Sequence, residues 1–160
     1  LVRDRALPHV KHIFYDGAEA ARPAPGAVQA IADADLVVIG PSNPLAGIGP
    51  IIAIRPIREA LRRLRGKVVA VSPIIGGGAI SGPSGRFMEA EGVEVSVRGV
   101  ARLYSDIASR IFADVSDSKC LVGGPEPQPR LIAADILMKD AADSRRLANE
   151  IVSKCELGEP

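Results

Sequence analysis

The 160-residue chain has few of the residues on which several classes of protein depend. Aromatic residues make up only 3% of it and tryptophan is absent, which argues against the stacking platforms of proteins that bind single-stranded nucleic acid. The 20 basic and 19 acidic residues leave a net charge of +1, so no strong field favours nucleic acid or anionic lipid. No apolar run approaches the roughly 20 residues that span a bilayer, and no signal peptide is visible. We therefore expect no nucleic-acid partner and no membrane partner.

The chain also has only two cysteines and no recognisable set of catalytic side chains. Cys120 and Cys155 are isolated and lack metal-ligand spacing, which predicts free thiols in a cytoplasmic protein, with a disulfide or a reactive thiol as the alternatives. No Ser–His–Asp or Cys–His arrangement can be assembled. Asp114 and Asp117 are separated by a predicted turn and make a poor pair of Mg²⁺ ligands. The sequence therefore assigns no catalytic residue and no metal ligand.

What the chain does have is an alternation of strand-like and helix-like segments. Runs rich in β-branched residues predict strands at residues 10–15, 36–39, 67–72, 110–115 and 131–136, and a short one at Val93, Val95 and Val97. Apolar spacing predicts helices that start near residue 25 and near residue 50, and others at 56–65, 83–91 and 99–107. Asp140 caps a final helix whose predicted buried positions are Ala141, Ala148, Ile151 and Val152. This order predicts a Rossmann-like α/β fold, a largely parallel sheet with helices on both faces in three layers.

Residues 36–39 are all apolar, which predicts a strand buried on both faces of a parallel sheet. The loop that follows this strand is the strongest candidate for a binding site. Ligands of open α/β sheets bind beyond the carboxyl ends of the strands. Glycines leave backbone N–H groups accessible, and short polar side chains donate hydrogen bonds to phosphate oxygens. We predict substrate binding by Gly40, Ser42, Asn43, Pro44, Gly47 and Gly49. The alternative is a plain strand-to-helix turn, in which glycine supplies geometry and proline supplies rigidity.

A second glycine-rich loop follows the run 67–72. Consecutive glycines are conformationally costly, so they predict either a close approach of the backbone to a ligand or a flexible lid, with a simple connector as the alternative. The predicted binding residues here are Ser72, Pro73, Gly76, Gly77 and Gly78. Right-handed crossovers put both loops at one edge of the sheet, where they predict a shared pocket for a diphosphate.

Five segments carry a resemblance to a known family. Residues 21–26 read Ala-Arg-Pro-Ala-Pro-Gly, and residues 34–44 read Ala-Asp-Leu-Val-Val-Ile-Gly-Pro-Ser-Asn-Pro. The others are Ile-Gly-Pro-Ile at 48–51, Ile-Arg-Glu-Ala-Leu at 57–61 and Val-Ser-Pro-Ile-Ile-Gly at 71–76. In this succession they resemble the 2-phospho-L-lactate transferase (CofD-type) family of coenzyme F-420 biosynthesis. Tyr104 fits the same pattern, whereas Gly47 stands where the family often has serine.

The resemblance implies a transferase that moves a phospholactyl or phosphoenolpyruvyl group from a guanosine-diphosphate-linked donor. The acceptor would be the ribityl hydroxyl of the deazaflavin FO, GMP would leave, Mg²⁺ would assist, and the form implied is a homodimer. The family's first strand, its N-terminal glycine-rich loop and its metal-binding carboxylates precede the matched region. We therefore expect residues 1–160 to form a single α/β domain, incomplete at the N-terminus. This would be the C-terminal part of a longer transferase, without turnover by itself.

Two other classes stay open. A related family of regulatory proteins, the gluconeogenesis factors, binds nucleotide sugars on the same architecture without transferring a group. Its corresponding loop reads Gly-Pro-Gly-Ser, whereas residues 40–44 read Gly-Pro-Ser-Asn-Pro, which favours the transferase. A Rossmann-like oxidoreductase needs a full Gly-x-Gly-x-x-Gly with an acidic residue about 20 positions later, and Gly47-Ile48-Gly49 supplies only part of it.

Overall fold

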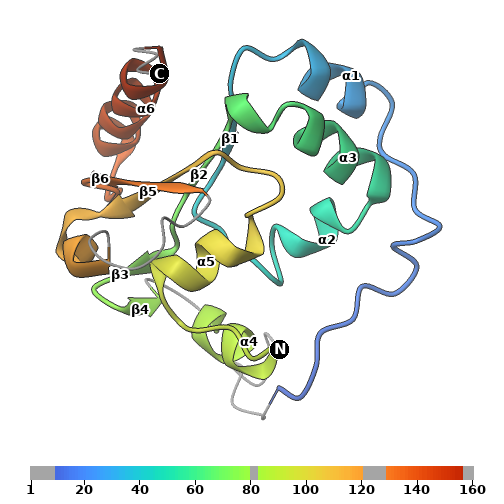
Figure 1. Cartoon of the computed structure of the whole chain (residues 1–160), viewed down its shortest axis with the longest axis horizontal. Coiled ribbons are helices and arrows are strands. Elements are labelled where there is room, and N and C mark those ends of the chain that lie inside the picture. The colour runs from blue at the N-terminus through green and yellow to red at the C-terminus, as the bar shows by residue number, and fades with distance from the viewer. Residues whose placement is uncertain (1–9, 80–82, 121–128, 157–160) are drawn as a thin grey trace.

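The structure, a computed structural model, describes residues 10–79, 83–120 and 129–156 (Figure 1). Within these ranges, one parallel sheet has the order β1 (Val37–Ile39), β2 (Val68–Val71), β5 (Arg110–Asp114) and β6 (Arg130–Ala134). A separate antiparallel hairpin consists of β3 (Ile74–Ile75) and β4 (Gly78–Ala79). The parallel sheet confirms the predicted α/β class.

Helices connect the strands much as the apolar spacing predicts. The chain passes from α1 (Ala27–Asp33) into β1, and from β1 to β2 through α2 (Gly49–Ile52), α3 (Arg55–Arg63) and η1 (Arg65–Lys67). It reaches β5 through the hairpin, α4 (Ser84–Ala90) and α5 (Val97–Leu103), and continues into η2 (Val115–Cys120). The last helix, α6 (Ala141–Glu156), follows β6. None of the helices in the described ranges is both long and apolar enough to span a bilayer.

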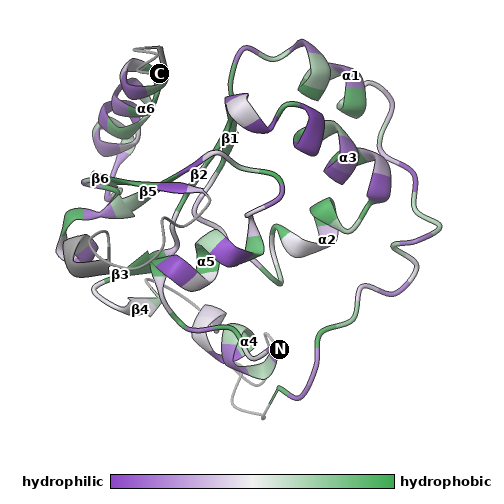
Figure 2. Cartoon of the chain, in the orientation of Figure 1, coloured by the Kyte–Doolittle hydropathy of each residue, from purple (hydrophilic) through white to green (hydrophobic). Residues whose placement is uncertain are grey.

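The central strands send alternate side chains into two apolar cores. Val68 and Ala70 belong to the larger core with residues of α2, α3, α4 and α5, whereas Val69 and Val71 belong to the smaller core with Leu147 of α6. Successive side chains of a strand point to opposite faces, so this split puts helices on both faces. Figure 1 shows α6 apart from the other helices, and Figure 2 shows the apolar colouring of the strands between them. The predicted three-layer arrangement is confirmed.

The first strand of the sheet is less buried than predicted. All four residues of β2 are buried, but Val38 of β1 is 47% exposed. Val38 lies opposite Val69 and so faces the side that α6 covers, yet it is not part of the small core. Because β1 is an edge strand among the described residues, the prediction of a run buried on both faces is wrong at Val38.

Two predicted strands are wrong. Residues 10–15 form no strand, Phe14 is 83% exposed, and the Ile13 N–H donates to a carboxylate oxygen of Glu91 instead of to a neighbouring strand. β-branched and aromatic residues fit a pleated surface, but they form a strand only where a partner strand is within reach. The alternation at 93–97 is also no strand. Ser96 caps α5 there by accepting a hydrogen bond from the Gly99 N–H at 3.1 Å.

The buried stripe of α6 differs from the predicted one. Leu147 and Ile151, one turn apart, are buried, whereas Ala141 and Ala148 are exposed and Val152 is 42% exposed. Only Ile151 of the predicted positions is therefore buried. The orientation of a helix about its axis depends on the surface against which it packs, and apolar residues on both flanks of the stripe leave that orientation open in the sequence.

Gly99 is required by packing, because a methyl group at this position would overlap the carbonyl oxygen of Glu94, a backbone atom. We expect Gly99→Ala to lower the free energy of unfolding by about 3 kcal/mol. Gly66 is the matched control, since a methyl group there would have nothing within 4 Å. Gly66→Ala should change stability by less than about 0.5 kcal/mol. Urea denaturation of both variants tests the difference, and equal losses would contradict it.

A carboxylate joins α3 to the segment after α5. Asp106 accepts hydrogen bonds from Nε of Arg58 at 2.8 Å and from Nε of Arg62 at 2.6 Å, with a second bond from Arg58 at 2.8 Å. Burial alone would raise the pKa of Asp106, but the hydrogen bonds and charges of both arginines outweigh burial and hold that pKa below its ordinary value.

A carboxyl group with a depressed pKa stabilises the fold above its ordinary pKa, and this contribution disappears as the pH falls through the depressed value. We therefore expect the protein to lose stability on acidification from about pH 5 downward. Asp106→Asn should be less stable at neutral pH and should lose less on acidification. Thermal unfolding of both proteins across this range measures the effect, and parallel pH curves would contradict it.

Candidate functional site

The structure brings the beginnings of the two predicted loops to the same edge of the sheet. β1 and β2 pair in parallel with Ile39 opposite Ala70, so Gly40 and Ser72 emerge close to each other at the carboxyl ends of neighbouring strands. The chain beyond β5, from Asp114 to Asp117, leaves at this same edge because β5 is parallel to β2. We call this the carboxyl edge of the sheet. It is where ligands of open α/β folds bind.

The loop after β1 is closed by its own asparagine. The side-chain oxygen of Asn43 accepts the N–H groups of Leu45 at 3.0 Å and Ala46 at 2.9 Å. Its backbone carbonyl accepts the N–H groups of Gly47 at 2.9 Å and Ile48 at 3.0 Å. These bonds make a helix-like turn that leads into α2, so Asn43 shapes the loop and the Gly47 N–H already has a partner within it.

The glycines of this loop differ in what the fold requires of them. A methyl group at Gly47 would overlap the Ser42 hydroxyl, and one at Gly49 would overlap the Tyr15 hydroxyl. A methyl group at Gly40 would have no neighbour within 4 Å, and the Gly40 backbone is in an ordinary conformation. Packing therefore explains two of the glycines. It does not explain Gly40, which is exposed at the carboxyl end of β1.

The start of the second loop is buried. Ser72 is 0% exposed, and its hydroxyl oxygen accepts the Ile74 N–H at 3.0 Å and donates to the Ile74 carbonyl at 3.2 Å. Pro73 is also buried. The Ser72 hydroxyl is therefore engaged in a turn of the chain itself, and the exposed part of the segment lies further on, at the glycines.

The glycines 76–78 belong to the hairpin, not to an irregular loop. Gly76 and Gly77 form the two-residue turn between β3 and β4, with φ of 61° and 76°. Two successive residues with positive φ are typical of hairpin turns, and glycine adopts them without strain. The N–H groups of Gly76 and Gly77 donate to the two carboxylate oxygens of Asp117, at 3.0 and 2.9 Å. The turn therefore lies over the end of β5.

The acidic side chains at this edge already accept hydrogen bonds from other residues of the chain. Asp114 accepts hydrogen bonds from the N–H and the hydroxyl of Ser116, at 2.9 and 2.6 Å. Burial raises the pKa of Asp114, but these hydrogen bonds outweigh it and the pKa lies below its ordinary value. Within the described ranges, no group of three or more His, Cys, Asp or Glu side chains is arranged to hold a metal ion. The residues present therefore do not fit a complete Mg²⁺ site.

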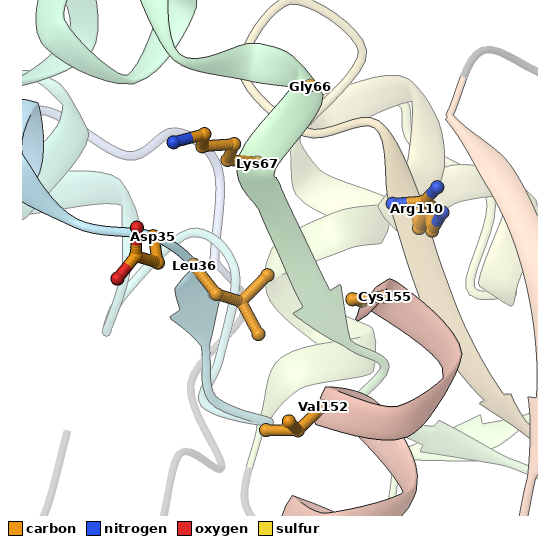
Figure 3. A pocket seen from close by; sticks show the side chains of 7 residues that line it. All are labelled: Asp35, Leu36, Gly66, Lys67, Arg110, Val152 and Cys155. Atoms are coloured by element: carbon orange, nitrogen blue, oxygen red, sulfur yellow. The ribbon is translucent and has the colours of Figure 1, made fainter. Parts of the chain in front are cut away.

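A cavity of about 300 Å³ lies at the opposite, amino-terminal edge of the sheet. Figure 3 shows the residues that line it, which precede β1 and β2, begin β5 or belong to the end of α6: Asp35, Leu36, Gly66, Lys67, Arg110, Val152 and Cys155. Burial raises the pKa of the free Cys155 thiol, partly offset by Arg110. None of the predicted site residues lines this cavity, so it is separate from the carboxyl edge.

Two residues that support the carboxyl edge could not be found from the sequence. Tyr15 donates its hydroxyl to the Leu45 carbonyl at 2.5 Å and occupies the space beside Gly49, and burial, with the charge of Glu91, raises its pKa. Asp117 holds the hairpin turn. Both lie at least 30 residues from the segment that they support, and no local spacing connects them to it.

The comparison with known proteins identifies the family. The model of the family described as 2-phospho-L-lactate transferase CofD matches residues 2–115. The chain belongs to the CofD family. It is 40% identical over 154 residues to the 2-phospho-L-lactate transferase of Methanocaldococcus jannaschii and 42% identical over 152 residues to that of Methanococcus vannielii. The predicted resemblance is confirmed.

The CofD relatives are longer than this chain. The two alignments cover 96% and 92% of the chain but only 48% and 47% of the respective relatives. The transferase of Methanopyrus kandleri gives the same proportions, with 43% identity over 91% of the chain and 46% of the relative. The chain thus spans about half the length of the curated relatives that it matches.

The Asn43 turn can be tested directly in this CofD chain. Asn43→Ala removes the acceptor of the Leu45 and Ala46 N–H groups, which should lower the free energy of unfolding by about 1 kcal/mol, as for the loss of a helix cap. Asn43→Asp keeps an acceptor at the same position and should be close to the original in stability. Chemical denaturation measures both. Equal stability of the alanine and aspartate variants would exclude this role of the side chain.

Proposed function

We propose that this chain is part of a transferase that moves a 2-phospholactyl or phosphoenolpyruvyl group from a guanosine-diphosphate-linked donor to the deazaflavin FO. The observation that carries the proposal is the family match over residues 2–115, together with relatives named 2-phospho-L-lactate transferase at about 40% identity. Because the chain spans about half the length of those relatives, the activity is proposed for the whole protein.

The reaction is attack of an alcohol on phosphorus. An oxygen of the FO ribityl chain forms a bond to the phosphorus that carries the lactyl or enolpyruvyl group. The bond from that phosphorus to the bridging oxygen of the diphosphate breaks, GMP leaves with the bridging oxygen, and the hydroxyl proton is released. Such a displacement needs alignment of the two oxygens and stabilisation of the charge on the phosphate oxygens more than covalent catalysis.

The carboxyl edge supports such a role. Gly40 and Ser42 are exposed at the carboxyl end of β1, and the packing of the described residues gives no reason for glycine at position 40. A bare backbone allows an anionic group to approach the main chain closely. We therefore assign Gly40 and the exposed Ser42 to contact with the substrate, while Asn43, Gly47 and Gly49 maintain the turn beside them.

Mg²⁺ would assist this transfer, and we expect its ligands to lie outside this chain. Asp114 and Asp117 already accept hydrogen bonds from Ser116 and from the hairpin turn. We propose that carboxylates outside the described residues hold the ion in the whole transferase.

Calorimetric titration of the transferase at its natural length with GDP, FO and a UDP-sugar tests the function. We expect binding of GDP and of FO, and stoichiometric release of GMP when FO is mixed with guanosine-diphosphate-linked lactate. Binding of the UDP-sugar without FO would favour the regulatory class instead. Absence of both GDP and FO binding would overturn the proposal.

A matched pair of glycine variants tests the position of the site. Gly40→Ala adds a methyl group into open space at the carboxyl edge, and Gly66→Ala adds one into open space before β2, at the other edge. We expect Gly40→Ala to raise the dissociation constant of GDP or FO about tenfold with unchanged stability, and Gly66→Ala to leave both constants unchanged. Equal affinities of the two variants would place the ligand elsewhere while leaving the proposed reaction intact.

A further inference from the structure

The turn Gly76–Gly77 is held by a residue that the proposed reaction has not used. Both carboxylate oxygens of Asp117 accept hydrogen bonds, one from the Gly76 N–H at 3.0 Å and one from the Gly77 N–H at 2.9 Å. Two parallel bonds from consecutive residues to one carboxylate fix the orientation of the turn as well as its position. Bonds to an ionised acceptor are stronger than bonds between neutral groups.

Asp117 itself lies inside the protein. It is 5% exposed, whereas Gly76 and Gly77 are exposed. The carboxylate therefore lies beneath the turn, between it and η2, and a substrate that reaches the turn from solvent meets the glycine backbone and not the acid. This arrangement gives Asp117 a role that acts through the turn.

The hairpin needs such an anchor because its own ladder is short. β3 and β4 contain two residues each, and an isolated two-stranded hairpin is marginally stable in water. Ile74, which is 0% exposed, anchors the base of the hairpin in the large core. Among the described residues, Asp117 supplies the side-chain hydrogen bonds to the tip.

The tip also presents open backbone at the carboxyl edge. A methyl group at Gly77 would have nothing within 4 Å, so glycine is required there by its positive φ and not by crowding. A methyl group at Gly78 would make only ordinary contact, at 3.9 Å from the Ile75 carbonyl oxygen. The turn thus offers uncovered main chain on the same edge as Gly40.

We propose that Asp117 is a positioning residue for the transferase site, holding the Gly76–Gly77 turn so that its exposed backbone forms one wall of the substrate-binding edge. The inference rests on the proposed function. It adds a buried acid from the β5 end of the sheet to a site whose other residues follow β1 and β2.

The test compares Asp117→Ala, Asp117→Asn and the control Asp135→Asn in the transferase at its natural length. Asp135 follows β6, accepts the Leu137 N–H and pairs with Arg146, so its loss should not affect the hairpin. NMR hydrogen exchange of the Gly76 and Gly77 amides reports the turn. Steady-state KM and kcat for FO and for the guanosine-diphosphate-linked donor report the site.

We expect exchange of the two glycine amides in Asp117→Ala to be at least about tenfold faster than in the original protein. The KM of at least one substrate should rise about tenfold while kcat changes less than about threefold. Asp117→Asn should lie between, because its amide oxygen accepts one of the two bonds. Asp135→Asn should match the original protein in both measurements.

A purely structural role would give faster exchange or lower stability with unchanged KM for both substrates, and that result would overturn the inference while leaving the proposed function standing. If Asp117→Ala does not fold, Asp117→Asn carries the test, and an unchanged KM in that variant overturns the inference as well. If the wild-type protein binds neither GDP nor FO, the proposed function is wrong. The wild-type titration shows this before any variant is measured, so the two failures are distinguishable.

Discussion

The parallel, in-register pairing of β2 with β1 and β5 is the constraint on which the rest of the molecule depends. β2 is buried on both faces, so its alternate side chains fix the large core on one side and the small core under α6 on the other. A shift of one residue would exchange the two sets, which makes the register specific. Since all three strands run the same way, their following segments meet at one edge.

At that edge, the fold itself explains many of the residues that look like ligand contacts. Asn43 closes its own turn, Ser72 is buried in another, and Gly76 and Gly77 are the glycines of a hairpin turn. A polar or glycine-rich loop satisfies its own backbone groups before it binds anything else. What remains after this accounting is the exposed glycine at position 40, which packing does not require. The hairpin turn requires its glycines, but it leaves their backbone uncovered at the same edge.

The two edges of the sheet differ in character. The carboxyl edge carries loops shaped by hydrogen bonds within the chain, whereas the amino-terminal edge carries the cavity lined in part by Lys67, Arg110 and Cys155. The proposed function places the ligand at the carboxyl edge, because open α/β sheets bind their ligands beyond the carboxyl ends of their strands.

The sequence by itself determined the α/β class, the strands β1, β2, β5 and β6, and the family, because buried apolar runs and the succession of Gly-Pro-Ser-Asn-Pro and Ser-Pro-Ile-Ile-Gly are local signals. Tertiary structure decided which strand-like runs found a partner: residues 10–15 did not, and Ser96 turned the run 93–97 into a helix start. It also decided the contact of Asp117 with a turn 40 residues earlier. Such contacts depend on the path of the chain in space, which no local spacing encodes.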